Sequence, residues 1–177
     1  LKNKQIVAVI TPDCDGQHTA ADVRAVADAL EKAPGTLVLA QRIFDENTPK
    51  RSMAGNRSTS AALRILYDID LPDTQTGLRG IPAPMLEAMS ALPGDRYEYE
   101  LNMLMWAKRN AIEFTQVPIE ARYFDNNAGS HYRTVRDSLP ILWRVLSGVV
   151  HYGFSATFSA VIDVLAYCVL IKLLLEN

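Results

Sequence analysis

The sequence predicts an α/β fold followed by an amphipathic helix and a membrane-spanning helix. Gln5 to Ile10 is a short apolar run rich in β-branched residues, typical of a strand buried on both faces of a parallel sheet. An amphipathic stretch separates this run from a second apolar run, Thr36 to Ala40. Far along the chain, the segment from Leu139 to Leu175 is strongly apolar, and its only charged residues are Arg144, Asp163 and Lys172.

Composition excludes several classes of protein. The 177 residues carry 18 basic and 20 acidic side chains, and this balance excludes a nucleic-acid-coating protein. A hydrophobic content of 49% excludes a disordered chain. Cys14 and Cys168 lie too far apart to suggest a disulfide framework or a cysteine zinc site. The chain starts at Leu1 without an initiator Met or a signal peptide, so we expect an N-terminally truncated fragment.

The first helix has clear start and stop signals. Thr19 can cap a helix over residues 20–33, and Pro34-Gly35 would end it. A strand, a helix and a strand in this order predict a right-handed βαβ unit with parallel strands. Ligands bind at the carboxyl ends of such strands, which are here Asp13 to His18 and Gln41 to Phe44.

The middle of the chain predicts shorter elements. Gly55 to Asp68 is expected to be a helix with Ala62, Ile65 and Leu66 facing inward. Asp73 to Gly80 is expected to be a polar turn. Two more helices and two extended pieces on either side of Pro118 are predicted over residues 84–91, 100–109, 114–117 and 119–123.

The C-terminal part is predicted to associate with a membrane. Thr134 to Ser147 has an amphipathic pattern that Pro140 would kink. Tyr152 to Ile171 is long enough, at about 20 residues, to span a bilayer, although Asp163 near its centre is costly there. A buried helix of a globular protein is the alternative. The basic residues that precede the span place the α/β part on the cytoplasmic side by the positive-inside rule: Arg133, Arg136 and Arg144.

A chemical motif directly follows the first strand. Asp13-Cys14-Asp15-Gly16-Gln17-His18 offers two carboxylates and a side-chain amide. Such hard oxygen ligands suit Mg²⁺ or Mn²⁺ holding a diphosphate, and they do not suit zinc. Asp13, Asp15 and Gln17 are therefore the predicted metal ligands, with an ordinary solvated turn as the alternative, and His18 is expected to be structural.

The motif after the first strand and several later segments, taken in their order along the chain, resemble glycosyltransferase family 2. Members of that family have the GT-A fold, a Rossmann-like nucleotide-diphospho-sugar transferase fold. The resemblance covers roughly Gln5 to Leu142 and is strongest to the polyprenyl-phosphate transferases, such as bactoprenol glucosyltransferases and dolichyl-phosphate mannose synthase. The tail from Trp143 is similar to the start of a GtrA-like membrane domain. The segments that carry the resemblance are Asp13 to His18, Gln41-Arg42, residues 50–57, Asp73 to Gly80, residues 96–100 and residues 125–133.

The resemblance implies an inverting, metal-dependent transfer and a role for each matching residue. The implied catalytic residues are Asp15, Arg42, Arg51, Glu98 and Glu100, with the two arginines guiding a lipid phosphate. The implied substrate-binding residues are Asp73, Gln75, Arg79, His131 and Arg133. Each position also has a structural alternative, such as a surface arginine, a turn cap or a helix-start carboxylate.

The implied partners are a UDP- or GDP-sugar, a polyprenyl phosphate and membrane lipid, with a homo-oligomer possible and no nucleic acid. The domain boundaries expected are 1–132 for the C-terminal part of a GT-A domain, 133–150 for an interface helix and 151–177 for the start of the membrane domain. Two other functions stay open. One is a polysaccharide-building transferase acting on a hydroxyl, although its usual Gln-x-x-Arg-Trp motif is absent from the sequence. The other is a non-catalytic membrane carrier component.

Overall fold

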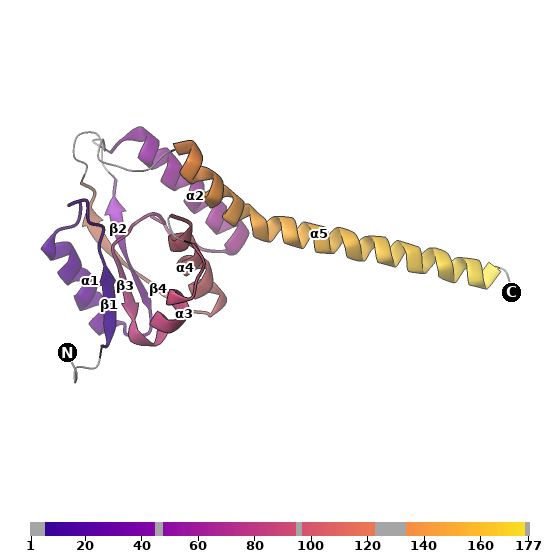
Figure 1. Ribbon diagram of the computed structural model, residues 1–177, viewed down its shortest axis with the longest axis horizontal. Helices are drawn as coiled ribbons and strands as arrows, with labels where there is room; N and C mark the ends of the chain where they lie inside the picture. The colour runs from indigo at the N-terminus through magenta and orange to yellow at the C-terminus, as the bar shows by residue number, and fades with distance from the viewer. Residues whose placement is uncertain (1–5, 45–47, 95–96, 123–133, 176–177) are drawn as a thin grey trace.

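The computed structural model describes residues 6–44, 48–94, 97–122 and 134–175. It consists of an α/β body from which one long helix projects (Figure 1). In chain order the elements are β1 (Ala8–Thr11), α1 (Ala20–Lys32), β2 (Leu37–Ile43), α2 (Lys50–Tyr67), β3 (Arg79–Pro82), the 3₁₀ helix η1 (Ala83–Met85), α3 (Leu86–Ser90), α4 (Tyr97–Arg109), β4 (Phe114–Glu120) and α5 (Thr134–Leu175).

The sheet is mixed, with strand order β1-β3-β2-β4. β3 pairs antiparallel with both β1 and β2, so β1 and β2 point in the same direction, as the βαβ prediction requires. The expectation that the first strand lies in a parallel sheet is nevertheless wrong, because β3 is inserted between β1 and β2 and runs antiparallel to both. β3 begins inside the predicted polar turn, at Arg79, and its sequence Arg-Gly-Ile-Pro lacks the β-branched pattern that marks a strand.

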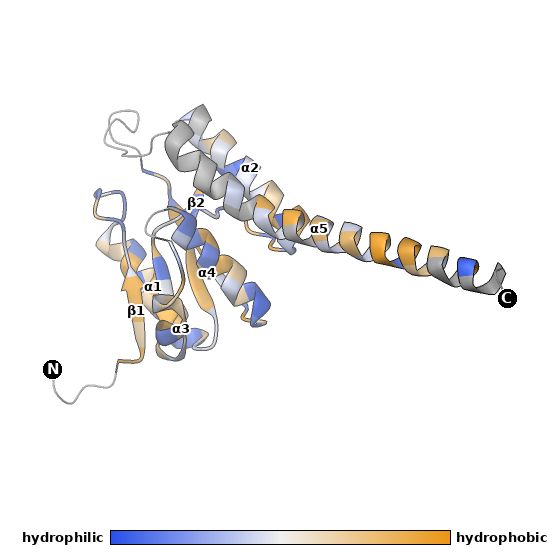
Figure 2. Ribbon diagram, turned by 45° about the vertical axis from the view of Figure 1, so that its right-hand side comes forward, coloured by the Kyte–Doolittle hydropathy of each residue, from blue (hydrophilic) through white to orange (hydrophobic). Residues whose placement is uncertain are grey.

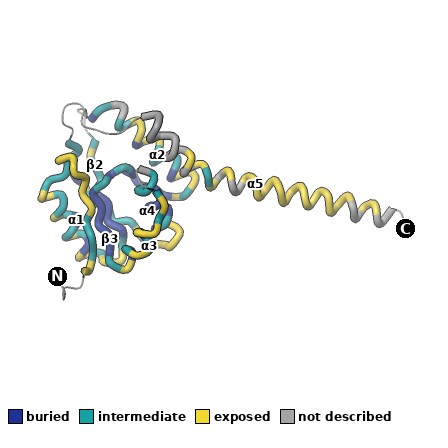
Figure 3. The backbone as a smooth tube through the Cα atoms, viewed as in Figure 1, coloured by how far each residue is buried: buried dark blue, intermediate teal, exposed yellow. Residues whose placement is uncertain are grey.

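Helices cover both faces of the sheet, as the alternation of buried residues along β2 requires. Val38 and Ala40 pack with Val26 and Leu30 of α1. Leu37 and Leu39 face the opposite way, into a larger core with residues of α2, α3 and α4. The inner strands are accordingly the most deeply buried part of the body (Figure 3).

Helix α1 starts where the sequence predicts. The Thr19 hydroxyl accepts the backbone N–H of Asp22 at 3.2 Å, and the Thr19 N–H donates to the Asp22 carboxylate at 2.7 Å. This reciprocal capping box satisfies two backbone donors at the helix start. It fixes the end of the loop that carries Asp13 and Asp15.

Two expectations about the sheet edges are wrong. β1 lies at one edge of the sheet and its residues are half-buried or exposed rather than buried on both faces, and Ile6 and Val7, placed in the predicted strand, precede β1 and are exposed. At the other edge, β4 is one strand that runs through Pro118 rather than two pieces separated by it. Proline is tolerated on an edge strand because no further strand needs its missing N–H.

Helix α2 is rotated relative to the prediction and begins earlier, at Lys50. Leu63 is a fully buried apolar residue of this helix, whereas Ile65 is 75% exposed and Leu66 is 36% exposed. Ile65 and Leu66 were expected to face inward on hydrophobicity alone. Residues two positions apart on a helix point about 200° apart, so a buried Leu63 and an inward Ile65 are incompatible.

Helix α5 is continuous for 42 residues, about 63 Å, and runs through Pro140. Its first part contacts α2 and α4, and the remainder extends away from the body (Figure 2). Leu146–Cys168 is long and apolar enough to cross a membrane, and none of that stretch is buried. This lack of burial favours a membrane span over a buried globular helix, and the candidate span begins six residues before the predicted one.

Candidate functional site

A cluster of charged side chains lies at the edge of the sheet where β1 and β2 end and β3 begins. The loop after β1 contributes Asp13, β2 contributes Arg42, and the extended segment before β3 contributes Asp73. Arg79 opens β3, and Glu100 lies in the first turn of α4. The fold thus brings together five residues that the sequence analysis selected, and the other four all lie more than 25 positions from Asp13 in the sequence.

Asp13 is held between a histidine and a glycine. Its Oδ2 lies 3.5 Å from Nε2 of His18, and a Cβ added to Gly77 would lie 2.1 Å from its Oδ1. The Thr11 hydroxyl also donates to the carbonyl of Gly77 at 3.3 Å. The hydrogen bond from His18 is the largest influence on the pKa of Asp13 and lowers it, with burial opposing this and Arg42 and Arg79 assisting it. Asp13 is therefore a carboxylate at neutral pH.

Asp15 and Gln17 occupy the exposed turn that follows. The backbone N–H of Gln17 donates to Oδ1 of Asp15 at 3.0 Å, and Gly16 has a φ of 81°. A positive φ is readily adopted by glycine, and it allows this tight turn to return the chain toward α1. Asp15 is exposed, whereas Asp13, whose side chain is 51% exposed, lies close enough to Arg42 and Arg79 for their charges to lower its pKa.

Arg42 and Asp73 form a bidentate ion pair. Nε and Nη2 of Arg42 donate to Oδ2 and Oδ1 of Asp73 at 2.7 and 2.9 Å, and the backbone N–H of Arg42 donates to Oδ2 at 3.1 Å. The Asp73 side chain is fully buried. The N–H of Gln75 caps the same carboxylate at 3.2 Å. Two parallel hydrogen bonds fix the plane of the guanidinium, and Arg42 also lies over the ring of Phe44, 5.5 Å from its centre.

Arg79 is buried beneath this pair and binds mainly backbone oxygens. It donates to the carbonyls of Thr76, Thr74 and Glu100 at 2.9, 3.4 and 2.8 Å. Its Nη2 also lies 3.6 Å from the Glu100 carboxylate. Its side chain is only 2% exposed. Its hydrogen bonds to the carbonyls of Thr74 and Thr76 therefore hold the backbone of the segment that carries Asp73 and Gly77 from the buried side.

Glu98 and Glu100 both lie in the first turn of α4. Residues two positions apart on a helix point in nearly opposite directions, so the two carboxylates do not share a face. Burial raises the pKa of Glu100 to about 7, although the positive charge of Arg79 lowers it; the negative charge of Asp13 adds to the rise. A carboxyl group with this pKa can exchange a proton near neutral pH.

Glu100 should make stability depend on pH. Its pKa is about 7 in the folded state and about 4.5 in the unfolded chain, so between these values the folded state holds a proton that the unfolded state releases. Stability should therefore fall as pH rises through this window. Urea unfolding in detergent at about pH 5 and about pH 8 checks this, with Glu100→Gln as the control that should lose most of the difference. Equal pH dependence in both proteins would contradict the assignment.

Three of the predicted residues are placed less completely. Arg51 lies in the first turn of α2, and only its backbone is described. His131 and Arg133 lie outside the described residues. Gln75 donates through Nε2 to the hydroxyl of Thr59 at 3.4 Å, which places its amide beside α2.

Sequence reasoning missed two residues that organise the site. His18 contacts Asp13 directly, and its side chain is only 5% exposed, while its Nδ1 has no hydrogen-bond partner among the described residues. Asn56 donates to the carbonyl of Pro72 at 2.7 Å and accepts the N–H of Thr74 at 3.1 Å, so it anchors the residues on both sides of Asp73. The position of His18 five residues after Asp13, on the same short loop, was the available signal for the first. Asn56 offered none.

The loop after β1 could hold a hard cation only if a bound ligand supplied some of the coordinating oxygens. Within the described ranges, no group of three or more His, Cys, Asp and Glu side chains is arranged to hold a metal. Asp13, Asp15 and Gln17 offer oxygen donors that suit Mg²⁺ or Mn²⁺, which keep several non-protein ligands. A diphosphate would supply the remaining oxygens, so the donor set fits a cation bound together with a phosphate ligand.

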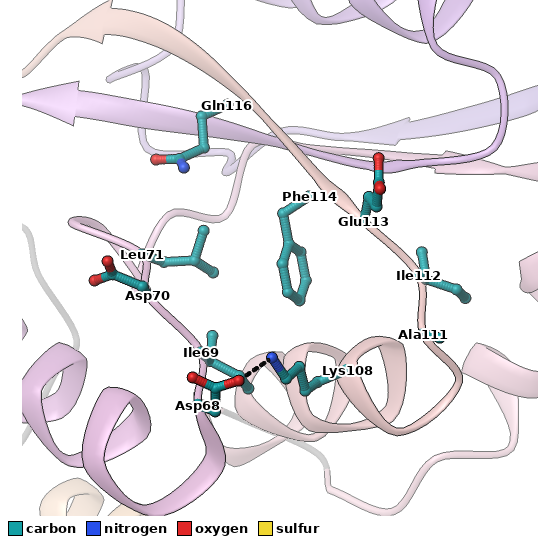
Figure 4. Close-up of a pocket in the computed structure, with 10 residues that line it drawn as sticks. All are labelled: Asp68, Ile69, Asp70, Leu71, Lys108, Ala111, Ile112, Glu113, Phe114 and Gln116. Atoms are coloured by element: carbon teal, nitrogen blue, oxygen red, sulfur yellow. Dashed lines mark hydrogen bonds and ion pairs between the residues drawn. The ribbon is translucent and has the colours of Figure 1, made fainter.

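A separate hollow of about 550 Å³ lies at the amino end of β4 (Figure 4). Phe114, Leu71 and Ile69 form an apolar part, and Asp68 pairs with Lys108 at 2.7 Å near them. β2 and β4 run parallel, and the charged cluster lies where β2 ends, whereas this hollow lies where β4 begins. The residues that line the hollow therefore include none of the predicted site residues.

Comparison with known proteins gives two relatives of this chain. The chain is 30% identical over 119 residues to a UDP-N-acetylglucosamine–dolichyl-phosphate N-acetylglucosaminyltransferase of Methanococcus voltae, which covers 64% of this chain and 47% of that protein. It is similar to a dolichyl-phosphate sugar transferase. It is also 27% identical over 120 residues to an uncharacterised protein of Methanocaldococcus jannaschii, covering 65% of this chain and 49% of that protein. No protein-family model matches the chain. The chain spans about half the length of the curated relatives it matches.

Proposed function

We propose that this chain is part of a glycosyltransferase that moves a sugar from a nucleotide donor to a polyprenyl phosphate. The observation that carries the proposal is the 30% identity to a dolichyl-phosphate N-acetylglucosaminyltransferase. The charged cluster at the carboxyl ends of β1 and β2 supports it, because open α/β sheets bind ligands there. The apolar helix α5 supports it as well, since a polyprenyl phosphate resides in a membrane.

The proposed reaction is an inverting displacement. An oxygen of the lipid phosphate forms a bond to the anomeric carbon of the sugar. The bond from that carbon to the diphosphate oxygen breaks on the opposite side, and its electron pair leaves with the nucleoside diphosphate. The lipid phosphate already carries most of its negative charge at neutral pH, so no base has to remove a proton from it.

What this acceptor requires is cationic guidance. Two anionic phosphate groups must approach each other in a site of lowered dielectric, and arginine offers the planar fork that matches phosphate oxygens. Asp73 orients the guanidinium of Arg42. We assign Arg42 and Arg51 to the lipid phosphate. Gln75, His131 and Arg133 are proposed to contact the substrates, and Asp73 and Arg79 to hold the surrounding backbone.

The donor diphosphate is proposed to lie beside the loop after β1. Asp13, Asp15 and Gln17 would hold Mg²⁺ or Mn²⁺ there, which would offset the charge that builds up on the departing diphosphate. His18 and Gly77 fix the direction of the Asp13 carboxylate. The exposed carboxylate of Asp15 can adjust to the ligand.

Glu100 favours a second candidate function. A sugar hydroxyl that attacks a donor must lose a proton, and a positioned base typically contributes about 10² to 10⁴ in rate. A carboxyl group whose pKa is about 7 is suited to that task. Transfer to a hydroxyl acceptor of a growing polysaccharide is therefore the alternative.

An acceptor panel tests the proposal against this alternative. Nucleotide sugars would be offered with undecaprenyl phosphate, with undecaprenol and with oligosaccharides. We expect transfer to the phosphate alone. Transfer to an oligosaccharide with none to undecaprenyl phosphate would replace the proposal by the alternative.

We further propose that α5 inserts into the membrane, with the α/β body on the cytoplasmic side. Alkaline carbonate washing should leave the protein in the membrane pellet, because Leu146–Cys168 would lie in hydrocarbon. A variant with Ile162→Arg and Leu165→Arg is the control: each arginine costs about 2.5 to 3.5 kcal/mol at the centre of a span, so it should be released. Release of the unaltered chain would show that α5 is not inserted.

A further inference from the structure

The last turn of α2 exposes apolar side chains on the surface of the body. Ile65 is 75% exposed and Leu66 is 36% exposed, directly after the exposed Arg64. Single exposed apolar residues are ordinary on protein surfaces. Ile65 and Leu66 differ from such ordinary exposed residues because of the position at which α2 ends.

Helix α2 ends beside the start of the candidate membrane span. The hydroxyl oxygen of Tyr67, the final residue of α2, lies 2.8 Å from the Cβ that a side chain at Gly148 would have. Gly148 is the third residue of the span Leu146–Cys168. Figures 1 and 2 show the same arrangement, with α2 running along the first part of α5 until α5 leaves the body. A membrane crossed by α5 would therefore begin at the level of Ile65 and Leu66.

The surroundings of this turn have the chemistry of a bilayer interface. Trp143 of α5, five residues before Gly148, is 68% exposed. Tryptophan is enriched at the level of lipid headgroups. The 18 residues of α2 contain no Asp or Glu, and their four basic residues are Lys50, Arg51, Arg57 and Arg64. Arg57 and Arg64 lie nearest the last turn and are complementary to anionic lipids, while the carboxylate of Asp68, which directly follows α2, is paired with Lys108 at 2.7 Å.

We propose that the last turn of α2 is a lipid-contacting surface, with Ile65 and Leu66 entering the headgroup region of an anionic bilayer. The inference rests on the membrane placement of α5 given under the proposed function, and it does not depend on the transfer reaction. Arg51 lies at the opposite end of α2, so the lipid contact is confined to the last turn of the helix.

Spin labels on the full chain in lipid vesicles test the inference. Cys14 and Cys168 are both exposed and would first be changed to serine. Single cysteines would then be introduced by Ile65→Cys, by Val161→Cys in the span and by Asp28→Cys on α1, which covers the other face of the sheet. Each label would be scored by its collision rate with oxygen, which concentrates in lipid, and with a water-soluble nickel complex. Vesicles would be phosphatidylcholine with or without phosphatidylglycerol.

We expect the oxygen-to-nickel ratio of the Ile65 label to exceed that of the Asp28 label several-fold. The ratio should be higher with phosphatidylglycerol than without it, because anionic lipid attracts Arg57 and Arg64. A label at Ile65 that behaves like the one at Asp28, while the Val161 label lies in lipid, would overturn the inference and leave the membrane placement intact. Water exposure of the Val161 label would overturn the membrane placement itself. Shielding of the Ile65 label from both reagents would mean that protein covers the turn, and the lipid surface would be rejected.

Discussion

Replacing Arg42 by alanine should lower transfer to polyprenyl phosphate far more than replacing Glu98 or Glu100 by glutamine. Hydrogen bonds to charged groups contribute about 1.5 to 3 kcal/mol each, so loss of one phosphate contact corresponds to roughly 10- to 100-fold in rate. Arg51→Ala should have an effect of the same order. The two glutamine variants should stay close to the unaltered protein, since a phosphate acceptor needs no base. Initial rates with undecaprenyl phosphate and saturating donor measure the difference.

The Arg42 result needs a control for folding, because Asp73 is buried and Arg42 neutralises it. Breaking a buried pair costs about 3 to 5 kcal/mol of stability. Rates should therefore be normalised to the folded fraction obtained from thermal unfolding. Arg42→Lys keeps the charge and removes the fork, so it should be more stable than Arg42→Ala and still impaired in transfer. Lys108→Ala disrupts an exposed pair outside the site and should leave the rate unchanged. Mild arginine variants together with an inactive glutamate variant would favour the hydroxyl acceptor.

Gly77→Ala should nearly abolish metal-dependent transfer. The new Cβ would overlap the carboxylate of Asp13, which cannot remain where it is. A misdirected Asp13 no longer compensates charge on the departing diphosphate, and loss of one such electrostatic contact typically costs about 10² to 10³ in rate. Turnover measured against Mn²⁺ concentration should show a lower maximum and weaker dependence on the metal.

Gly35→Ala is the matched control, because a Cβ at Gly35 meets no atom within 4 Å. It should leave both the rate and the metal dependence unchanged. Normal Mn²⁺-dependent turnover in Gly77→Ala would contradict the role of Asp13. Full activity of the unaltered protein in excess chelator would contradict the metal proposal as a whole.

The sequence predicted the elements that carry local signals. Thr19 predicts the start of α1, where the structure adds a capping box with Asp22, and the apolar run at 36–40 predicts β2. The sequence could not predict β3, because four residues that include arginine, glycine and proline become a strand only through pairing with both neighbours.

In the candidate site, too, local sequence signals predicted some residues, whereas other features depend on the tertiary structure. Asp13 and Asp15 were found from their spacing after a strand. The pairing of Arg42 with Asp73, 31 residues away, depends on the sheet topology and could not be derived from either residue alone. The burial of Arg79 was also inaccessible, since arginine is usually exposed and only the tertiary structure supplies the backbone carbonyls that satisfy it. The orientation of α2 depends on which of its apolar residues the core accepts, and Leu63 rather than Ile65 occupies that position.

The most direct test of the central proposal is the number of phosphorus atoms between lipid and sugar in the reaction product. Membranes containing the protein would be incubated with undecaprenyl phosphate and a nucleotide sugar, and the lipid product would be examined by mass spectrometry and ³¹P nuclear magnetic resonance. Attack of the lipid phosphate on the anomeric carbon predicts a single phosphodiester linking polyprenol and sugar, with release of a nucleoside diphosphate. A polyprenyl diphosphate sugar with release of a nucleoside monophosphate, or sugar recovered only on a hydroxyl acceptor, would contradict it.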